Sequence, residues 1–118
     1  PDPLRIGIVG ASNGTTTLLD FSVFSVMART VEEPAAVVLL SGCTYTTNQN
    51  PLDELAFDGA PALFVYPAAE AGWNETVAVD APDVWSFVEI DPGAHGTGLF
   101  TADPTTIPLV ADFLATSL

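Results

Sequence analysis

The chain has 118 residues, 48% of them hydrophobic, which is enough for a single folded domain with a buried core. Fifteen acidic residues against two basic ones give a formal net charge of −13, which repels nucleic-acid phosphates and anionic lipid surfaces, so we expect neither as a partner. The single cysteine, Cys43, excludes an intrachain disulfide and a cysteine zinc cluster, and no apolar run approaches the roughly 20 residues of a membrane span.

The first predicted strand leads directly into a short motif. Residues 4–9 are typical of a short buried strand, and residues 15–29 form an apolar helical stretch. Between them, residues 10–14 read G-A-S-N-G, a G-x-S-x-G pattern at a strand-to-helix turn. Such a nucleophile elbow strains the serine backbone and lifts its Oγ clear of the sheet. Glycines are expected on both sides because a Cβ there would collide with the neighbouring strand or helix. Ser12 is therefore the predicted nucleophile.

Three more strands follow along the chain, and the first of them is a continuous apolar run of the kind expected for a strand covered on both faces. They are predicted at residues 35–40, 62–66 and 85–90. Residues 44–60 predict a loop, and a short helix is expected near residues 74–79. Asp103 or Thr106 is expected to cap a C-terminal helix with one apolar face.

Strands that alternate with helices predict a single α/β domain over residues 1–118, with a mostly parallel sheet and flanking helices. Catalytic groups of such sheets lie at the carboxyl ends of the strands. This rule selects Ser12 after the first strand, residues 67–70 after the third, and residues 93–96 after the fourth. The last group holds His95, the only histidine, on a glycine-flanked loop from which an imidazole can reach Ser12.

These motifs resemble the C-terminal catalytic half of the α/β-hydrolase superfamily, in its esterase and dienelactone-hydrolase-like branch, where a serine, an acid and a histidine follow one another along the chain. The resemblance covers nearly all 118 residues and implies a partial α/β-hydrolase fold. It is carried by the elbow, the strand after it, the acid strand with its loop, and the histidine loop, at residues 8–14, 37–41, 63–70 and 92–97.

The resemblance implies a serine hydrolase that acts on carboxylic esters or related small acyl compounds, without a cofactor or metal. Ser12 would attack the carbonyl, His95 would remove the serine proton, and Glu70 would hold the imidazole in the right tautomer. Other acids remain open for the last role, namely Asp58, Asp83 and Asp91. Side chains near these loops are candidates for a substrate pocket, namely Tyr45, Tyr66, Trp73, Thr97, Phe100 and Thr101.

The oxyanion hole of such an enzyme needs two donors. The N–H of Asn13, at the start of the predicted helix, is the expected first donor. In the family, the second comes from a loop after an earlier strand, whereas this chain begins at the nucleophile strand. We therefore expect that a missing N-terminal half, a second chain or another copy of this one completes the site, and that the first strand has an uncovered edge.

Two other functions stay open. Residues 7–14 also lie between a strand and a helix as a phosphate-binding glycine loop does, which suggests a dinucleotide-binding Rossmann-like module. The G-x-G-x-x-G fingerprint is not met, however, and the next strand ends in Leu40-Ser41-Gly42 without an acid for a ribose. The second alternative is a non-catalytic hydrolase remnant or assembly subunit, suggested by the uncovered first strand.

Overall fold

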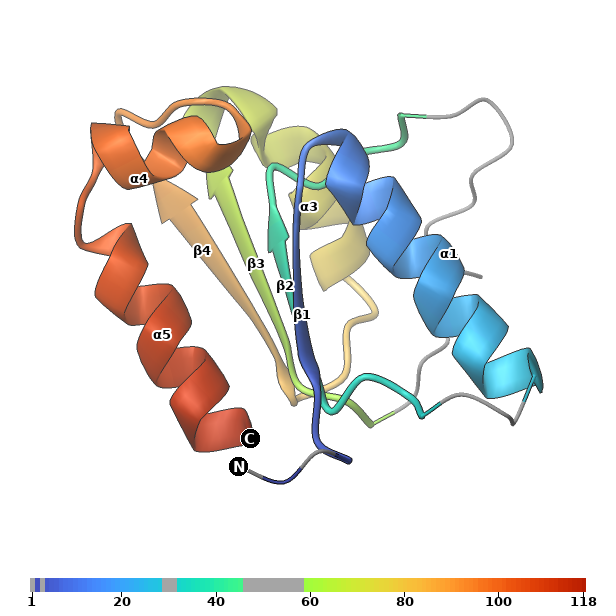
Figure 1. Ribbon diagram of the computed structural model, residues 1–118. Helices are drawn as coiled ribbons and strands as arrows, with labels where there is room; N and C mark the ends of the chain where they lie inside the picture. The colour runs from blue at the N-terminus through green and yellow to red at the C-terminus, as the bar shows by residue number, and fades with distance from the viewer. Residues whose placement is uncertain (1, 3, 29–31, 46–58) are drawn as a thin grey trace.

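The computed structural model describes residues 2, 4–28, 32–45 and 59–118. Four strands form one sheet in the order β1-β2-β3-β4, and every neighbouring pair is parallel (Figure 1). Their bounds are β1 (Gly7–Ala11), β2 (Ala36–Leu40), β3 (Ala62–Pro67) and β4 (Trp85–Ile90). The predicted α/β class, with a parallel sheet and flanking helices, is confirmed.

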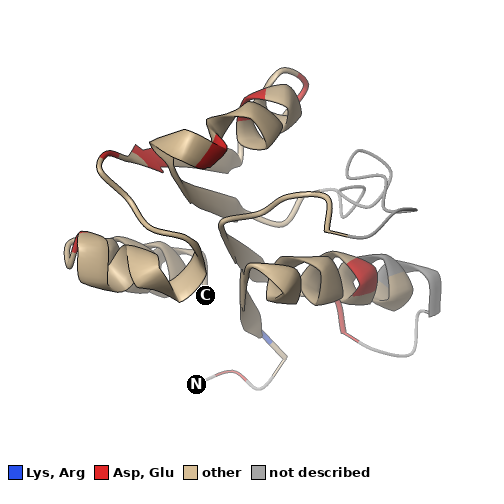
Figure 2. Cartoon of the chain, turned by 90° about the horizontal axis from the view of Figure 1, so that it is seen from above, with Lys and Arg blue, Asp and Glu red and all other residues tan. Residues whose placement is uncertain are grey.

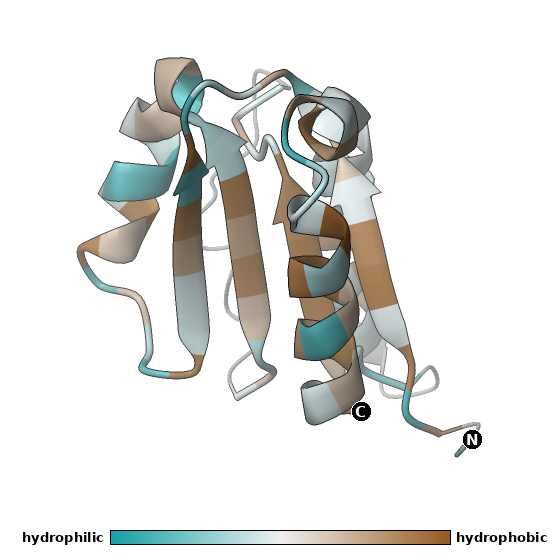
Figure 3. Cartoon of the chain, turned by 90° about the vertical axis from the view of Figure 1, so that its left-hand side faces the viewer, coloured by the Kyte–Doolittle hydropathy of each residue, from teal (hydrophilic) through white to brown (hydrophobic). Residues whose placement is uncertain are grey.

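Helices cover both faces of the sheet. α1 and α3 lie on one face and α5 on the other, while α4 lies at the carboxyl ends of the strands (Figure 1). Figure 3 shows α5 across its face, with hydrophobic residues along the strands behind it. The helices are α1 (Asn13–Ala28), α3 (Ala71–Ala78), α4 (Leu99–Ala102) and α5 (Thr106–Ser117), and two 3₁₀ turns are η1 (Ala68–Glu70) and η2 (Gly96–Gly98).

The core consists of two layers because side chains alternate between the two faces of a strand. Leu39 and Phe64 point toward α1 and α3, where Phe64 stacks on the ring of Phe87 with centroids 4.5 Å apart. Leu40 and Val65 point toward the α4 and α5 side. Every residue of β2 and β3 is buried. Burial of each large apolar side chain contributes about 1.5–3 kcal/mol, so the two central strands form a firm base for the loops at their ends.

The first strand differs most from its prediction. β1 begins at Gly7, opposite Ala36 of β2, and runs through Ala11, whereas residues 4–9 were expected. Leu4 and Ile6 are 64% and 53% exposed and lie before the pairing begins. The carbonyl of Ile6 still accepts the N–H of Ala35 at 2.9 Å, so the contact with the partner segment ends at Ile6, and the apolar run extends further toward the N-terminus than the strand does. The helix that follows begins at Asn13, two residues earlier than expected.

The remaining elements agree closely with expectation or were not predicted. β4 has the predicted bounds, and α3 covers most of the short helix expected near residues 74–79. The expected cap of α5 at Asp103 or Thr106 was wrong, because Thr105 is the N-cap and no side-chain hydrogen bond caps the helix. The carboxylate of Asp103 instead accepts hydrogen bonds from the N–H and hydroxyl of Thr105, just before α5. η1, η2 and α4 were not predicted, because turns of three or four residues are too short to show a periodicity. Most of the predicted loop at residues 44–60 lies outside the described residues.

Charge is distributed unevenly over the molecule. Figure 2 shows acidic residues on helices and loops around the sheet. Arg5, before β1, is the only basic residue in the part of the chain that the structure describes. None of the described helices is long and apolar enough to cross a bilayer.

Candidate active site

Ser12 occupies a strained turn between β1 and α1. Its φ is +52°, a left-handed conformation that costs an L-residue roughly 1–2 kcal/mol. Its N–H donates to the carbonyl of Leu40 in β2 at 2.9 Å, and its own carbonyl accepts from the N–H and hydroxyl of Thr15 at 2.9 and 2.7 Å. The turn is thus fastened to the neighbouring strand on one side and to the first turn of α1 on the other. These bonds fix the strained conformation that the motif predicted.

The two glycines of the motif differ in their surroundings. A Cβ at Gly10 would lie 2.7 Å from the carbonyl oxygen of Gly14 and 3.1 Å from the Cα of Thr15, so only glycine lets the strand pass this close to the helix. A Cβ at Gly14 would meet nothing within 4 Å. The prediction that both positions need glycine is confirmed for Gly10 and wrong for Gly14.

Glu70 ends the 3₁₀ turn η1, which follows β3 without a break. The fully buried Asn74 of α3 donates through Nδ2 to the backbone carbonyl of Glu70 at 3.1 Å. This bond ties η1 to the helix after it, and the carboxylate projects from the carboxyl edge of the sheet. The position of the acid is therefore set by an anchored turn and not by a free loop.

His95 lies on the loop after β4, and two contacts hold this loop to the end of the sheet. A Cβ at Gly93 would lie 2.6 Å from Cβ of Pro67, the last residue of β3, so the loop backbone packs directly on that strand. The N–H of the buried Gly96 donates to Oγ of Ser41 at 2.8 Å. Ser41 follows β2, is fully buried, has a φ of +55°, and donates its own N–H to Val65 of β3 at 2.8 Å.

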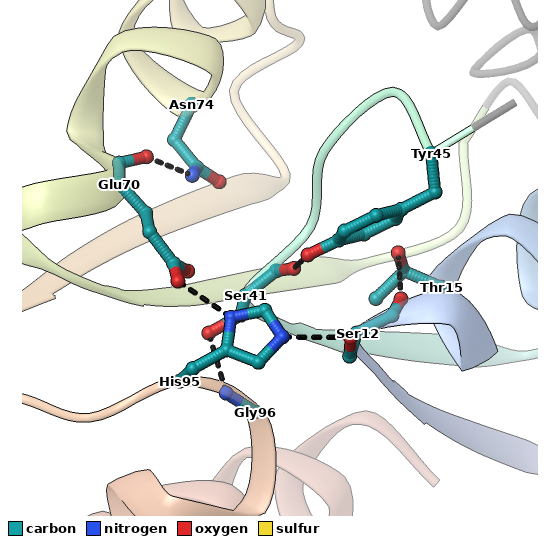
Figure 4. Close-up of polar contacts among 8 residues, drawn as sticks. All are labelled: Ser12, Thr15, Ser41, Tyr45, Glu70, Asn74, His95 and Gly96. Carbon is teal, nitrogen blue, oxygen red and sulfur yellow. Dashed lines mark hydrogen bonds and ion pairs between the residues drawn. The ribbon is translucent and has the colours of Figure 1, made fainter. Parts of the chain in front are cut away.

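The three predicted residues meet at the carboxyl ends of the strands (Figure 4). Oγ of Ser12 lies 2.7 Å from Nε2 of His95, and Oε1 of Glu70 lies 2.5 Å from Nδ1 of the same ring. An ionised carboxylate only accepts hydrogen bonds, so it selects the tautomer with the proton on Nδ1. Nε2 then accepts from the serine hydroxyl. Glu70 and His95 follow Ser12 by 58 and 83 residues in the sequence, and the three side chains form one line of hydrogen bonds in the fold.

Glu70 is the carboxylate that the structure pairs with His95. Of the other candidate acids, Asp83 lies in the turn before β4, at the amino end of that strand and so at the opposite edge of the sheet. Asp91 follows β4 with an exposed side chain, and Asp58 lies outside the described residues.

Ser41 was missed as a site residue, and Tyr45, expected as a pocket residue, also lies beside the line of hydrogen bonds. The hydroxyl of Tyr45 donates to the carbonyl of Ser41 at 2.6 Å, and its ring meets the His95 ring edge to face with centroids 6.3 Å apart. Burial raises the pKa of Tyr45 above 10.0, and the nearby Ser12 hydroxyl offsets part of that rise. Tyr45 was expected only as a pocket residue, and Ser41 only as the end of a strand. Nothing in the sequence pattern connects Ser41 to a loop 55 residues away.

Asn13 is the first residue of α1. Its N–H belongs to the first turn, where no earlier helical carbonyl accepts it, and the positive end of the helix dipole adds to its donor strength. Asn13 directly follows Ser12 in the chain, and its role as an oxyanion donor stays a prediction.

The described residues contain no group of three or more His, Cys, Asp and Glu side chains that could hold a metal ion. No family model, curated protein or solved structure matches the chain. The chemistry of the site therefore follows from its own geometry. A hydroxyl on a strained turn, an imidazole of defined tautomer and a carboxylate behind it form an arrangement that can activate an oxygen nucleophile.

Proposed function

We propose that this chain is a serine hydrolase that acts on carboxylic esters or related acyl compounds. The observation that carries the proposal is the continuous line of hydrogen bonds from Ser12 through His95 to Glu70. The resemblance of these motifs to α/β-hydrolases adds a second, independent argument, because it selects the same three residues from their order along the chain.

In the proposed reaction, Oγ of Ser12 attacks the ester carbonyl while Nε2 of His95 takes the hydroxyl proton. The carboxylate of Glu70 stabilises the imidazolium that forms. As the tetrahedral intermediate collapses, His95 gives the proton to the leaving alcohol, and an acyl group stays on Ser12. Water then attacks the acyl group by the same steps in reverse, which releases the carboxylic acid and the free serine.

The negative charge on the tetrahedral oxygen requires donors, and we assign the Asn13 N–H as the first. Loss of one oxyanion donor typically lowers kcat by about 10²–10³. We further propose that a segment pairing with the open edge of β1 completes this hole and the sheet, as an N-terminal part, a second chain or another copy. Among the described strands only β2 pairs with β1, so β1 is an edge strand. Ile6, just before this strand, is 53% exposed, and Val9, within it, is 46% exposed.

The experiment combines a covalent probe with kinetics. A fluorophosphonate probe should label the protein, and the label should disappear in Ser12→Ala. Hydrolysis of p-nitrophenyl acetate should fall at least about 10³-fold in His95→Ala, with a smaller loss in Glu70→Gln. Ser25→Ala is the matched control, because it also removes a buried hydroxyl, one that bonds only to the carbonyl of Ser22 within α1. Wild-type rates in both Ser12→Ala and His95→Ala would reject the proposal.

A non-catalytic assembly subunit is the second candidate, favoured by the open edge of β1. The two candidates separate in one experiment. An assembly subunit would associate, as seen by native mass measurement, without any labelling of Ser12. A hydrolase is labelled at Ser12 whatever its state of association.

A further inference from the structure

A cavity of about 370 Å³ opens beside the imidazole of His95. Its wall comes from three segments that the sheet brings together: the residues after β2, the turn η1 with the start of α3, and the loop after β4. The side chains that matter below are Cys43, Tyr45, Glu70, Trp73 and His95. The volume lies within the range of small-molecule sites.

The indole of Trp73 forms a fixed apolar wall of this cavity. Its Nε1 donates to the hydroxyl of Thr44 at 3.1 Å, so its one polar atom already has a partner. The ring lies directly over Gly42, where a Cβ would be 2.8 Å from the indole. The hydrogen bond of the indole N–H is therefore made outside the cavity, and the remaining indole surface is available to an apolar group.

The described wall of the cavity holds no permanent positive charge, because His95 is charged only while it carries the serine proton. Its charged wall residue is Glu70, and none of the residues that line it is Lys or Arg. The two basic residues of the chain are Arg5 and Arg29, and Arg5 donates to the carbonyl of Ser117 near the amino end of β1. Arg29 lies outside the described residues. A carboxylate or phosphate in this cavity would lose its hydration without gaining an ionic partner among the described residues.

The position of the cavity distinguishes the two ends of an ester. His95 and Glu70 belong to its wall, and Ser12 does not. In the tetrahedral intermediate the leaving oxygen must face Nε2 of His95, because that nitrogen supplies its proton. The alcohol side of the ester therefore lies by the imidazole, next to this cavity.

We propose that this cavity is the subsite for the alcohol part of the substrate, and that it selects esters of aromatic or bulky apolar alcohols that carry no negative charge. The proposal rests on the hydrolase function proposed above. It assigns Trp73 and Tyr45 as the apolar walls of the subsite and Cys43 as a residue whose enlargement fills it. Tyr66 and Phe100, also expected near a pocket, instead pack in the two core layers.

The test compares two series of esters. One holds the acyl group constant, with benzyl acetate against methyl acetate, and the other holds the alcohol constant, with methyl hexanoate against methyl acetate. In Cys43→Phe the benzyl-to-methyl ratio of kcat/KM should fall at least about 10-fold, while the hexanoate-to-acetate ratio stays as in the wild type. Trp73→Ala, which adds no bulk, should lower the benzyl-to-methyl ratio roughly 5-fold through loss of an aromatic wall.

A matched control fills a different cavity. Ser86→Phe enlarges a residue in the wall of a cavity of about 560 Å³ between the sheet and α5, and both ratios should stay unchanged.

The charge argument is tested in the wild type, where kcat/KM for 4-carboxybenzyl acetate should be at least about 10-fold lower than for benzyl acetate.

Several results would overturn the subsite. A change confined to the acyl series in Cys43→Phe would assign the cavity to the acyl group, and no change in either series for both variants would remove it from the substrate site. A preference for the carboxylated ester would refute the charge argument. Failure of the hydrolase proposal looks different, because then the wild type would neither hydrolyse these esters nor be labelled at Ser12.

Discussion

Ser41→Ala tests whether the histidine loop is held in place by a single buried hydroxyl. Oγ of Ser41 accepts the N–H of Gly96 at 2.8 Å, and both residues are buried. Without that oxygen the N–H has no acceptor in a dry environment, which costs about 1–3 kcal/mol. For a domain of this length, each kcal/mol corresponds to roughly 4 °C in Tm. We therefore expect a clear fall in Tm from this one atom.

The functional effect follows from the position of Gly96 directly after His95. If the loop relaxes toward a new partner for its N–H, Nε2 moves away from the 2.7 Å contact with Ser12. A displacement of about 1 Å at a reacting group commonly lowers the rate about 10²-fold. We expect kcat for p-nitrophenyl acetate to fall by roughly 10–10²-fold, with KM nearly unchanged, because Ser41 is not expected to touch the substrate.

Two other substitutions separate positioning from stability. Ser22→Ala removes an equally buried hydroxyl, one that donates to the carbonyl of Leu18 within α1, and should leave kcat unchanged. Ser41→Cys retains a weak acceptor at the same place and should recover part of kcat. Thermal unfolding and steady-state kinetics on the same samples give both quantities. The reasoning fails if Ser41→Ala loses stability yet keeps wild-type kcat, or if Ser22→Ala loses as much kcat.

Further predictions concern the turn at Ser12 and the tyrosines. Gly10→Ala should destabilise the fold by several kcal/mol, because its Cβ would lie 2.7 Å from a backbone oxygen. Gly14→Ala should stabilise α1 by about 0.5–1 kcal/mol, because its Cβ would meet nothing within 4 Å. Chemical denaturation measures both changes, and equal effects would contradict the close approach of α1 to β1 at Gly10. Burial raises the pKa of both Tyr45 and Tyr66 in the folded protein, so their contribution to stability should be fully present below pH 10.0 and lost as the pH rises through the folded values. Phenolate absorbance should therefore rise at higher pH in the folded protein than in urea, and a lower folded midpoint would refute this.

The sequence pattern predicted those elements whose burial is complete. β2 and β3 are buried at every residue, and their apolar runs were located to within one residue. β1 was displaced because Leu4 and Ile6 are as apolar as a buried strand but lie before the first partner in β2. The extent of an edge strand is set by its one neighbour, which a local pattern does not reveal. The short turns η1 and η2 depend in the same way on the strand ends that they follow.

The site shows a similar division between what is local and what is not. The order of Ser12, Glu70 and His95 along the chain, with the rule that parallel strands end at one edge, was enough to predict that they lie together. Their roles in catalysis stay a prediction until the variants are measured. Ser41 was missed as a site residue because its contacts exist only after folding, and a serine at a strand end is an ordinary residue in a sequence. Tyr45 was expected to line a pocket, and it does line the cavity beside His95.

The end of β2 contributes no reactive group in the proposed mechanism, yet the turn of Ser12 and the histidine loop are both bonded to it. The carbonyl of Leu40 accepts the N–H of Ser12. The carbonyl of Ser41, the next residue, accepts a hydrogen bond from the Tyr45 hydroxyl, and its side-chain oxygen accepts one from the N–H of Gly96 in the histidine loop. The N–H of Ser41 donates to the carbonyl of Val65 in β3. Because β2 lies between β1 and β3, one buried strand end can hold elements on both sides in register. The distance between Ser12 and His95 is therefore fixed by the sheet and not by the flexibility of the loops, which is the condition that rapid proton transfer between them requires.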